Sequence, residues 1–185
     1  MVQSLQDIQI LYEKSLCDCD FVYQLDNGRS LHIRFFRENL CHLLGLQHVY
    51  QQDRHYLGAA GYKRIKDERI TLASLKAHNR KQYDFIKPRI EHFHEIENIL
   101  RNGSLYRFYP ERCTPQTRIN AEFMLIDPKE SYMLHLFVRS EANESIFTPI
   151  SFLVKFAGDK DYQQFLTRQE HRKILFFACN AISNL

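Results

Sequence analysis

The dipeptide Asn27-Gly28, set between two strand-like runs, constrains the fold of this chain more than any other feature of its sequence. The runs are residues 20–25 and 30–36; in the second, apolar side chains alternate with mostly polar ones, which is the period of a strand with one buried face. Asn-Gly between such runs is a strong hairpin signal, because both residues readily adopt the positive φ of a two-residue turn. The sequence therefore predicts a hairpin with a two-residue turn at Asn27 and Gly28.

Residues 31–50 continue from this hairpin as a strand followed by a short helix. Asn39 is a suitable N-cap, leucines follow at helical spacing, and Gly45 offers a stop. This assignment places His42 in the first turn, where the helix dipole favours a neutral imidazole and attracts anions. Arg34 and Arg37 add positive charge nearby, so the segment can hold a phosphate beside a proton-transfer group. The alternative is that His42 is an ordinary helix residue and the arginines form a solvated face.

The remaining patterns are mainly helical up to about residue 101 and strand-like after it. Helices are expected over 4–16, 71–78 and 81–101, with Pro88 as a kink or a true helix start. Strands are expected over 105–109, 121–126, 132–139 and 146–156, followed by a helix over 161–169 and a short strand or helix tail over 173–178. This order predicts an α+β fold in which helices pack on one face of a small antiparallel sheet. No linker or repeat divides residues 1–185, so one domain is expected.

Composition narrows the class of protein. The chain has 185 residues, 44% hydrophobic and 25% charged, which is typical of a globular domain. A net charge of +3, with nine histidines counted as neutral, permits an RNA partner without requiring one. No apolar run approaches the ~20 residues of a membrane span, so we expect a cytoplasmic protein without a membrane partner.

The cysteines and histidines do not have the spacing of a metal site. The five cysteines are odd in number and scattered, which argues against a disulfide framework. His92 and His94 are two residues apart, whereas the zinc-binding helix motif needs two histidines four apart. The sequence therefore predicts neither a metal nor another cofactor.

A basic stretch follows Tyr50 and contains Lys63 and Arg64 beside Tyr62. Cations can meet phosphates while aromatic rings stack on bases, so this stretch is a candidate RNA-binding surface. The alternative is a solvated helix face.

Four segments resemble, in this order, the phage-associated barnase/EndoU/colicin/RelE-like nuclease family, and specifically its fourth subtype. They are FRENLCHLLGL at 36–46, RINAEFML at 118–125, LF at 136–137 and PISF at 149–152. The His-Leu-Leu-Gly-Leu block that begins at His42 is the most distinctive. The resemblance implies a barnase/RelE-like fold and a metal-independent ribonuclease, with RNA as the ligand and an immunity or antitoxin protein as a partner.

Cleavage of RNA without a metal needs a proton-transfer group and cations for the phosphate. We assign the proton transfer to His42 and the phosphate contacts to Arg34 and Arg37. Ser151 can donate a hydrogen bond to a phosphate oxygen, and Lys155, four residues on, lies on the same strand face. Both can equally be ordinary strand residues. The alternative function is a non-catalytic RNA-binding or protein-interaction module that retains the nuclease-like fold.

Overall fold

A computed structural model describes residues 4–51, 53–140 and 145–182 of the chain. The described α-helices are α1 (Leu5–Tyr12), α2 (Asn39–Leu43), α3 (Leu46–Val49), α4 (Gly58–Lys66), α5 (Leu72–His78), α6 (Arg80–Glu91) and α7 (Ile96–Asn102). The strands are β1 (Cys19–Leu25), β2 (Ser30–Arg34), β3 (Ser104–Arg107), β4 (Phe123–Pro128), β5 (Tyr132–Ser140), β6 (Ile146–Phe156), β7 (Glu170–Arg172) and β8 (Ile174–Ala181). The α+β class expected from the sequence is confirmed.

The sheet is larger than predicted, and it is not purely antiparallel. Its eight strands follow the order β7-β3-β4-β5-β6-β2-β1-β8, and β2 runs parallel to β6 through the pairs His32 with Ile146 and Ile33 with Phe147. This parallel pairing joins the N-terminal hairpin to the antiparallel β4-β5-β6 meander, so that one sheet replaces the small antiparallel sheet of the prediction. The paired residues of β2 and β6 are more than a hundred positions apart in the chain, so no local sequence pattern could predict this pairing.

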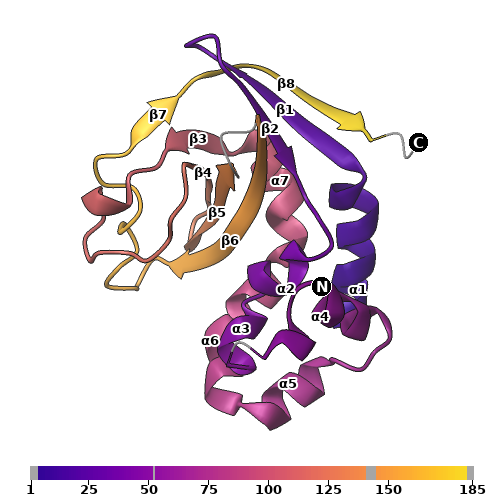
Figure 1. The fold of residues 1–185 in the computed structure, drawn as a ribbon. Coiled ribbons are helices and arrows are strands. Elements are labelled where there is room, and N and C mark those ends of the chain that lie inside the picture. The colour runs from indigo at the N-terminus through magenta and orange to yellow at the C-terminus, as the bar shows by residue number, and fades with distance from the viewer. Residues whose placement is uncertain (1–3, 52, 141–144, 183–185) are drawn as a thin grey trace.

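The C-terminal segment nearly closes this sheet into a barrel (Figure 1). β7 pairs with β3 and β8 pairs with β1, although Lys173 alone separates β7 from β8 in sequence. The Lys173 carbonyl oxygen accepts a hydrogen bond from the Asp26 amide at 3.1 Å, which attaches the segment to the tip of the hairpin. Both ends of the strand order are thus covered by one continuous stretch of chain.

The hairpin itself is present, but its turn differs from the predicted two-residue type. Leu25 and Arg29 close the loop, since the Leu25 amide donates to the Arg29 carbonyl oxygen at 2.9 Å and the Gly28 amide donates to the Leu25 carbonyl oxygen at 3.0 Å. Gly28 has a φ of +79°, whereas Asn27 is not among the residues of positive φ. The turn is therefore a three-residue loop with a left-handed glycine at its last position.

The long helix expected over 81–101 is two helices. α6 ends at Glu91, a single 3₁₀ turn covers Phe93–Glu95, and α7 begins at Ile96. Pro88 lies inside α6 and is neither its start nor the position of the break. The expected helix over 161–169 is also absent, because this segment forms a series of turns. The expected helix at 71–78 is confirmed as α5.

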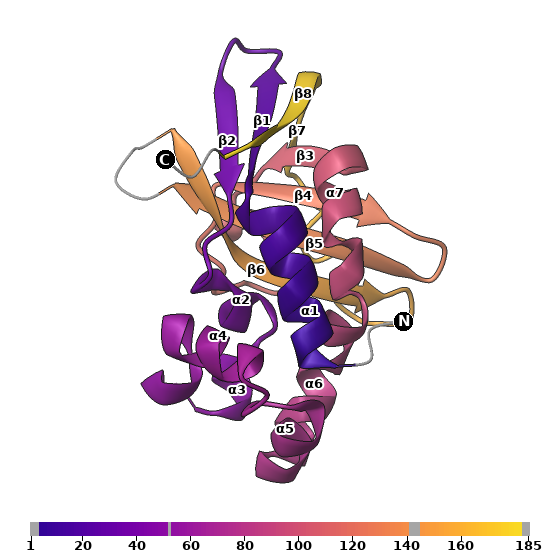
Figure 2. The ribbon, with the colours of Figure 1, turned by 90° about the vertical axis from the view of Figure 1, so that its right-hand side faces the viewer.

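Two apolar clusters lie on opposite faces of the sheet. The larger contains α1, α6 and α7, and Figure 2 shows α1 and α7 in front of the strands. The smaller is built around Phe108, Phe137 and Phe165 on the other face. Among the described helices, none is both long enough and apolar enough to cross a membrane.

Candidate active site

A cleft of about 800 Å³ lies where the small helices meet the face of the sheet that carries the smaller apolar cluster. Its walls come from α2, α3 and α6, from the loop at 117–120, and from β5 and β6. The polar and charged side chains that line it are Glu38, Asn39, His42, Gln47, His48, Arg89, Thr117, Arg118, Asn120, Arg139, Thr148, Ser151 and Lys155. The cleft therefore unites segments that are distant in sequence.

His42 lines this cleft, but not from the first turn of a helix. α2 has only five residues, and His42 lies in its last turn, where its carbonyl oxygen accepts from the Gly45 amide at 3.0 Å. The predicted effect of a helix N-terminus on this imidazole is therefore wrong. Partial desolvation by the cleft walls lowers the pKa of His42, whose side chain stays exposed to solvent, and the charge of Arg89 lowers it further.

His48, on α3, is a second histidine of the same wall. Its side chain is also exposed, and partial desolvation lowers its pKa, with smaller contributions from Arg89 and His42. His48 was not among the residues that the sequence indicated. Two imidazoles that are neutral at pH 7 thus face the cleft beside one buried cation.

Arg89, on α6, is that cation and is the least expected residue of the site. Its side chain is only 7% exposed, and it forms no ion pair or hydrogen bond with the residues that the structure describes. Burial lowers its pKa to about 10. An arginine remains protonated at that value, so a positive charge lies in the cleft wall without a counter-ion among the described side chains.

Gly45 allows Arg89 to approach α2 closely. It adopts a φ of +82°, and a Cβ at this position would lie 2.9 Å from Ile86 Cγ2 and 3.2 Å from Arg89 Nη1. A larger residue would collide with α6 as well as strain the backbone. The glycine predicted as a helix stop therefore also fixes the cleft wall.

One sequence signal could have identified Arg89. It lies three residues after Ile86 and four before Phe93, which places it on the apolar stripe of the helix pattern. A charged residue on a buried stripe is a candidate functional residue.

β6 contributes Ser151 and Lys155, both of which line the cleft as the shared strand face predicted. A register shift opposite Phe137 and Val138 pairs these residues with Ser151 and Pro149, and leaves Ile150 without a partner. Such a bulge changes the direction of neighbouring side chains. The Lys155 ammonium forms an ion pair with Asp161 and lies 5.7 Å from the centroid of the Phe165 ring.

Arg118 and Arg139 complete the charged lining of the cleft. Neither forms a side-chain ion pair within the described ranges. Against these cations and Lys155, the only acidic residue among the described lining residues is Glu38. The cleft is therefore positively charged and suited to an anion.

The other four predicted site residues lie outside this lining. Arg34 pairs with Asp20 at 3.0 Å, and Asp20 also contacts His32 at 3.2 Å. Lys63 pairs with Asp67 at 2.8 Å, and the Arg64 guanidinium lies over the Tyr56 ring at 5.1 Å. Asp20 lies in the hairpin, and Asp67 and Tyr56 lie in the helical region, so these contacts are made within the fold and away from the cleft.

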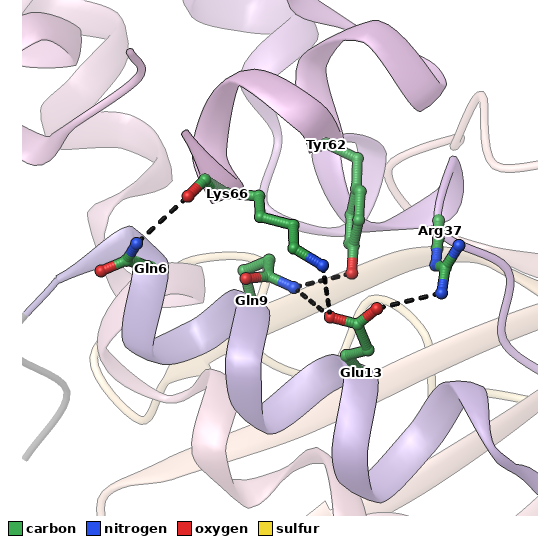
Figure 3. A network of polar contacts seen from close by, with 6 residues as sticks. All are labelled: Gln6, Gln9, Glu13, Arg37, Tyr62 and Lys66. Carbon is green, nitrogen blue, oxygen red and sulfur yellow. Dashed lines mark hydrogen bonds and ion pairs between the residues drawn. The ribbon is translucent and has the colours of Figure 1, made fainter. Parts of the chain in front are cut away.

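Arg37 belongs to a polar network that joins α1 to α4 and to the segment before α2 (Figure 3). Glu13 accepts from Arg37 Nη2 at 3.0 Å, from Gln9 Nε2 at 2.8 Å and from Lys66 Nζ at 3.3 Å. Burial alone would raise the pKa of Glu13, but the bonds from Gln9 and Lys66 outweigh it and the pKa is lowered. The charge of Arg37 is thus used within the fold.

The described residues include no group of three or more His, Cys, Asp or Glu side chains placed to hold a metal ion. Searches of curated proteins and of solved structures found no significant match to the chain. A family model described as phage-Barnase-EndoU-ColicinE5/D-RelE like nuclease 4 matches residues 4–176 of the 185. As its sequence segments predicted, the chain belongs to this family of phage-associated nucleases.

Proposed function

We propose that this protein is a metal-independent endoribonuclease whose active site is the cleft between α2, α3, α6 and β6. The observation that carries the proposal is the buried Arg89, which has no counter-ion among the described side chains and lowers the pKa of both His42 and His48. A buried charge without a partner is unfavourable for folding, and a bound phosphodiester would supply the missing anion.

In the proposed reaction, neutral His42 takes the proton from a ribose 2′-OH, and the 2′-oxygen attacks the adjacent phosphorus. The bond from phosphorus to the 5′-oxygen then breaks, and that oxygen receives a proton from a water molecule, because His48 is itself neutral at pH 7. The products are a 2′,3′-cyclic phosphate and a 5′-hydroxyl. A positioned imidazole contributes on the order of 10² to 10⁴ in rate.

The cations hold the phosphate and stabilise the charge that develops on it. Arg89 is the central contact, because its guanidinium can donate two parallel hydrogen bonds to phosphate oxygens. Ser151 donates a further hydrogen bond, and Lys155, on the same strand, contacts the phosphate by giving up its ion pair with Asp161. Arg118 and Arg139 extend the positive surface along the RNA backbone.

The test is cleavage of an end-labelled RNA in the presence of EDTA. We expect wild-type protein to cleave, and His42→Ala to reduce the cleavage rate by about 10² or more while RNA binding changes far less. His32→Ala is the matched control, since His32 contacts Asp20 outside the cleft and its loss should leave the rate unchanged.

The pH dependence supplies a second readout. Because the pKa of His42 is lowered, the acid limb of kcat/KM should have its midpoint below the ordinary value of 6.5. Binding without cleavage by wild-type protein would support the non-catalytic RNA-binding alternative. If His42→Ala cleaves RNA at the wild-type rate, His42 is not the proton-transfer group.

A further inference from the structure

We infer that Phe85 is a stacking platform for an unpaired base, next to the phosphate that Arg89 holds. The inference rests on the proposed function for the position of the phosphate. It adds a residue that determines which form of RNA the cleft accepts.

Phe85 is exposed in a way that apolar residues in this protein generally are not. Its side chain is 60% exposed, although phenylalanine is usually buried. The other exposed large apolar side chains among the described residues are Ile10, Phe36, Phe156, Leu175 and Phe176, and none of these lines the cleft. Phe85 is therefore the one exposed phenyl ring at the described cleft surface, beside the imidazoles of His42 and His48.

The surroundings of Phe85 hold the ring in place. The His48 ring lies 5.3 Å away, centroid to centroid, at an interplanar angle of 83°. The Arg89 guanidinium lies over the Phe85 ring, 5.8 Å from its centroid. With these two neighbours in place the Phe85 side chain is still 60% exposed, which leaves ring surface for a base.

The spacing along α6 suits a single nucleotide. Phe85 and Arg89 are four residues apart, so they are neighbours on the helix surface with Cβ atoms roughly 5 to 6 Å apart. A base stacked on the ring therefore has its own or the adjacent phosphate within reach of the guanidinium. In a duplex the bases are stacked and paired internally and their faces are not available, so the platform selects unpaired RNA.

The experiment measures binding of a 2′-O-methyl RNA hexamer by fluorescence anisotropy. This probe lacks the free 2′-OH nucleophile and is not cleaved, so binding is measured apart from the reaction. Phe85→Ala should raise the Kd about 5- to 150-fold, the change that corresponds to about 1 to 3 kcal/mol per stacked base. Phe85→Trp should retain tight binding.

Two controls separate stacking from a general loss of surface. Phe176→Ala removes a ring of similar exposure, 57%, outside the cleft and should leave the Kd unchanged. A set of hexamers, each with one abasic position, should contain one member for which wild type and Phe85→Ala bind equally. A duplex of the same sequence should also not distinguish the two proteins.

The inference is overturned if Phe85→Ala binds the hexamer as wild type does, if every abasic hexamer shows the full Phe85→Ala loss, or if wild type binds no hexamer. If Phe85→Ala still cleaves RNA with an unchanged KM, the stacking role of Phe85 is wrong and the proposed nuclease function is retained. If Phe85→Ala loses binding and the wild-type protein cleaves no RNA, the stacking role is supported and the proposed nuclease activity is rejected.

Discussion

Two groups of charged side chains in this molecule differ in whether their charges are paired. In the network of Figure 3, Arg37 and Lys66 both contact Glu13. In the cleft, Arg89 has no such partner among the described residues. Behind the cleft wall, the buried and neutral His135 makes no side-chain hydrogen bond within the described part of the chain. Charges satisfied within the fold contribute to stability, whereas the unpaired charge of Arg89, which lines the cleft, is available to a ligand.

His135 belongs with the unsatisfied group because of where it lies. It is fully buried on β5, and its ring is 5.4 Å from Phe165, which lines the cleft. Burial, followed by the charge of Lys155, lowers its pKa to about 3. The cleft side of the molecule therefore carries polar groups at a cost in stability, which the α1 to α4 network does not.

The largest expected effect is on acid stability. Because the folded pKa of His135 is below its unfolded value of 6.5, the unfolded state binds a proton first, and stability falls as the pH drops from 6.5 towards 3. His135→Leu removes this dependence and should be more stable than wild type by about 3 kcal/mol at pH 4. Urea unfolding at several pH values measures it. The exposed His94→Leu should keep the wild-type slope; a wild-type slope in His135→Leu would contradict the assignment.

Arg89→Met should separate stability from binding. Removing a buried, unpaired charge is expected to raise the free energy of unfolding by about 1 to 3 kcal/mol, and to weaken RNA binding about 10- to 100-fold. The pKa of His42 should rise towards its ordinary value, since Arg89 is one of the causes that lower it. Denaturant titration, anisotropy and an NMR titration of the imidazole measure the three effects. Arg37→Met is the matched change in the paired network, and it should lose some stability and keep its RNA affinity. Equal losses of RNA affinity in both variants would contradict the distinction between paired and unpaired cations.

Glu13→Gln should show the smaller cost of breaking the paired network. We expect the free energy of unfolding to fall by about 1 kcal/mol at pH 7. This is less than the full value of charged hydrogen bonds, because Arg37 and Lys66 are more than half exposed. The pKa of Glu13 is lowered in the fold, so its contribution is present above its unfolded value of 4.5 and is lost as the pH falls through the folded value. The two proteins should therefore converge at low pH. A difference independent of pH would mean that Glu13 acts through packing alone.

Lys63→Ala should have the smallest effect. Lys63 is 75% exposed and pairs with Asp67 one turn along α4, outside the cleft. We expect RNA affinity to change by less than about twofold, since exposed pairs of this kind contribute little. Anisotropy at two salt concentrations measures it. A larger loss, with a shallower salt dependence, would restore the basic surface that the sequence indicated around Lys63 and Arg64.

Local patterns predicted the parts of the fold that depend on neighbouring residues. β6 occupies residues 146–156 as expected, and Gly45 ends α2 in a left-handed conformation. The hairpin at Asn27-Gly28 is present as well. These features follow from side-chain period and from the backbone freedom of glycine, both of which act over a few residues.

The position of a residue in the cleft was predictable only in part. His42, Ser151 and Lys155 line it, while Arg34 and Arg37, the cations closest to His42 in sequence, pair with Asp20 and Glu13. Proximity in sequence did not indicate which carboxylate lies within reach of each arginine. The choice of partner is made by the packing of α1 and β1 against the segment before α2.

The sequence by itself determined the family and the α+β class, and it indicated His42, at the start of the His-Leu-Leu-Gly-Leu block, as a residue of the candidate site. Only the tertiary structure decided that β2 pairs with β6, that one C-terminal segment covers both ends of the sheet, and that Arg89 is buried at the cleft. The physical reason is range. Helix, turn and strand preferences are summed over a few neighbouring residues, whereas strand pairing and the burial of a charge depend on contacts between segments far apart in the chain.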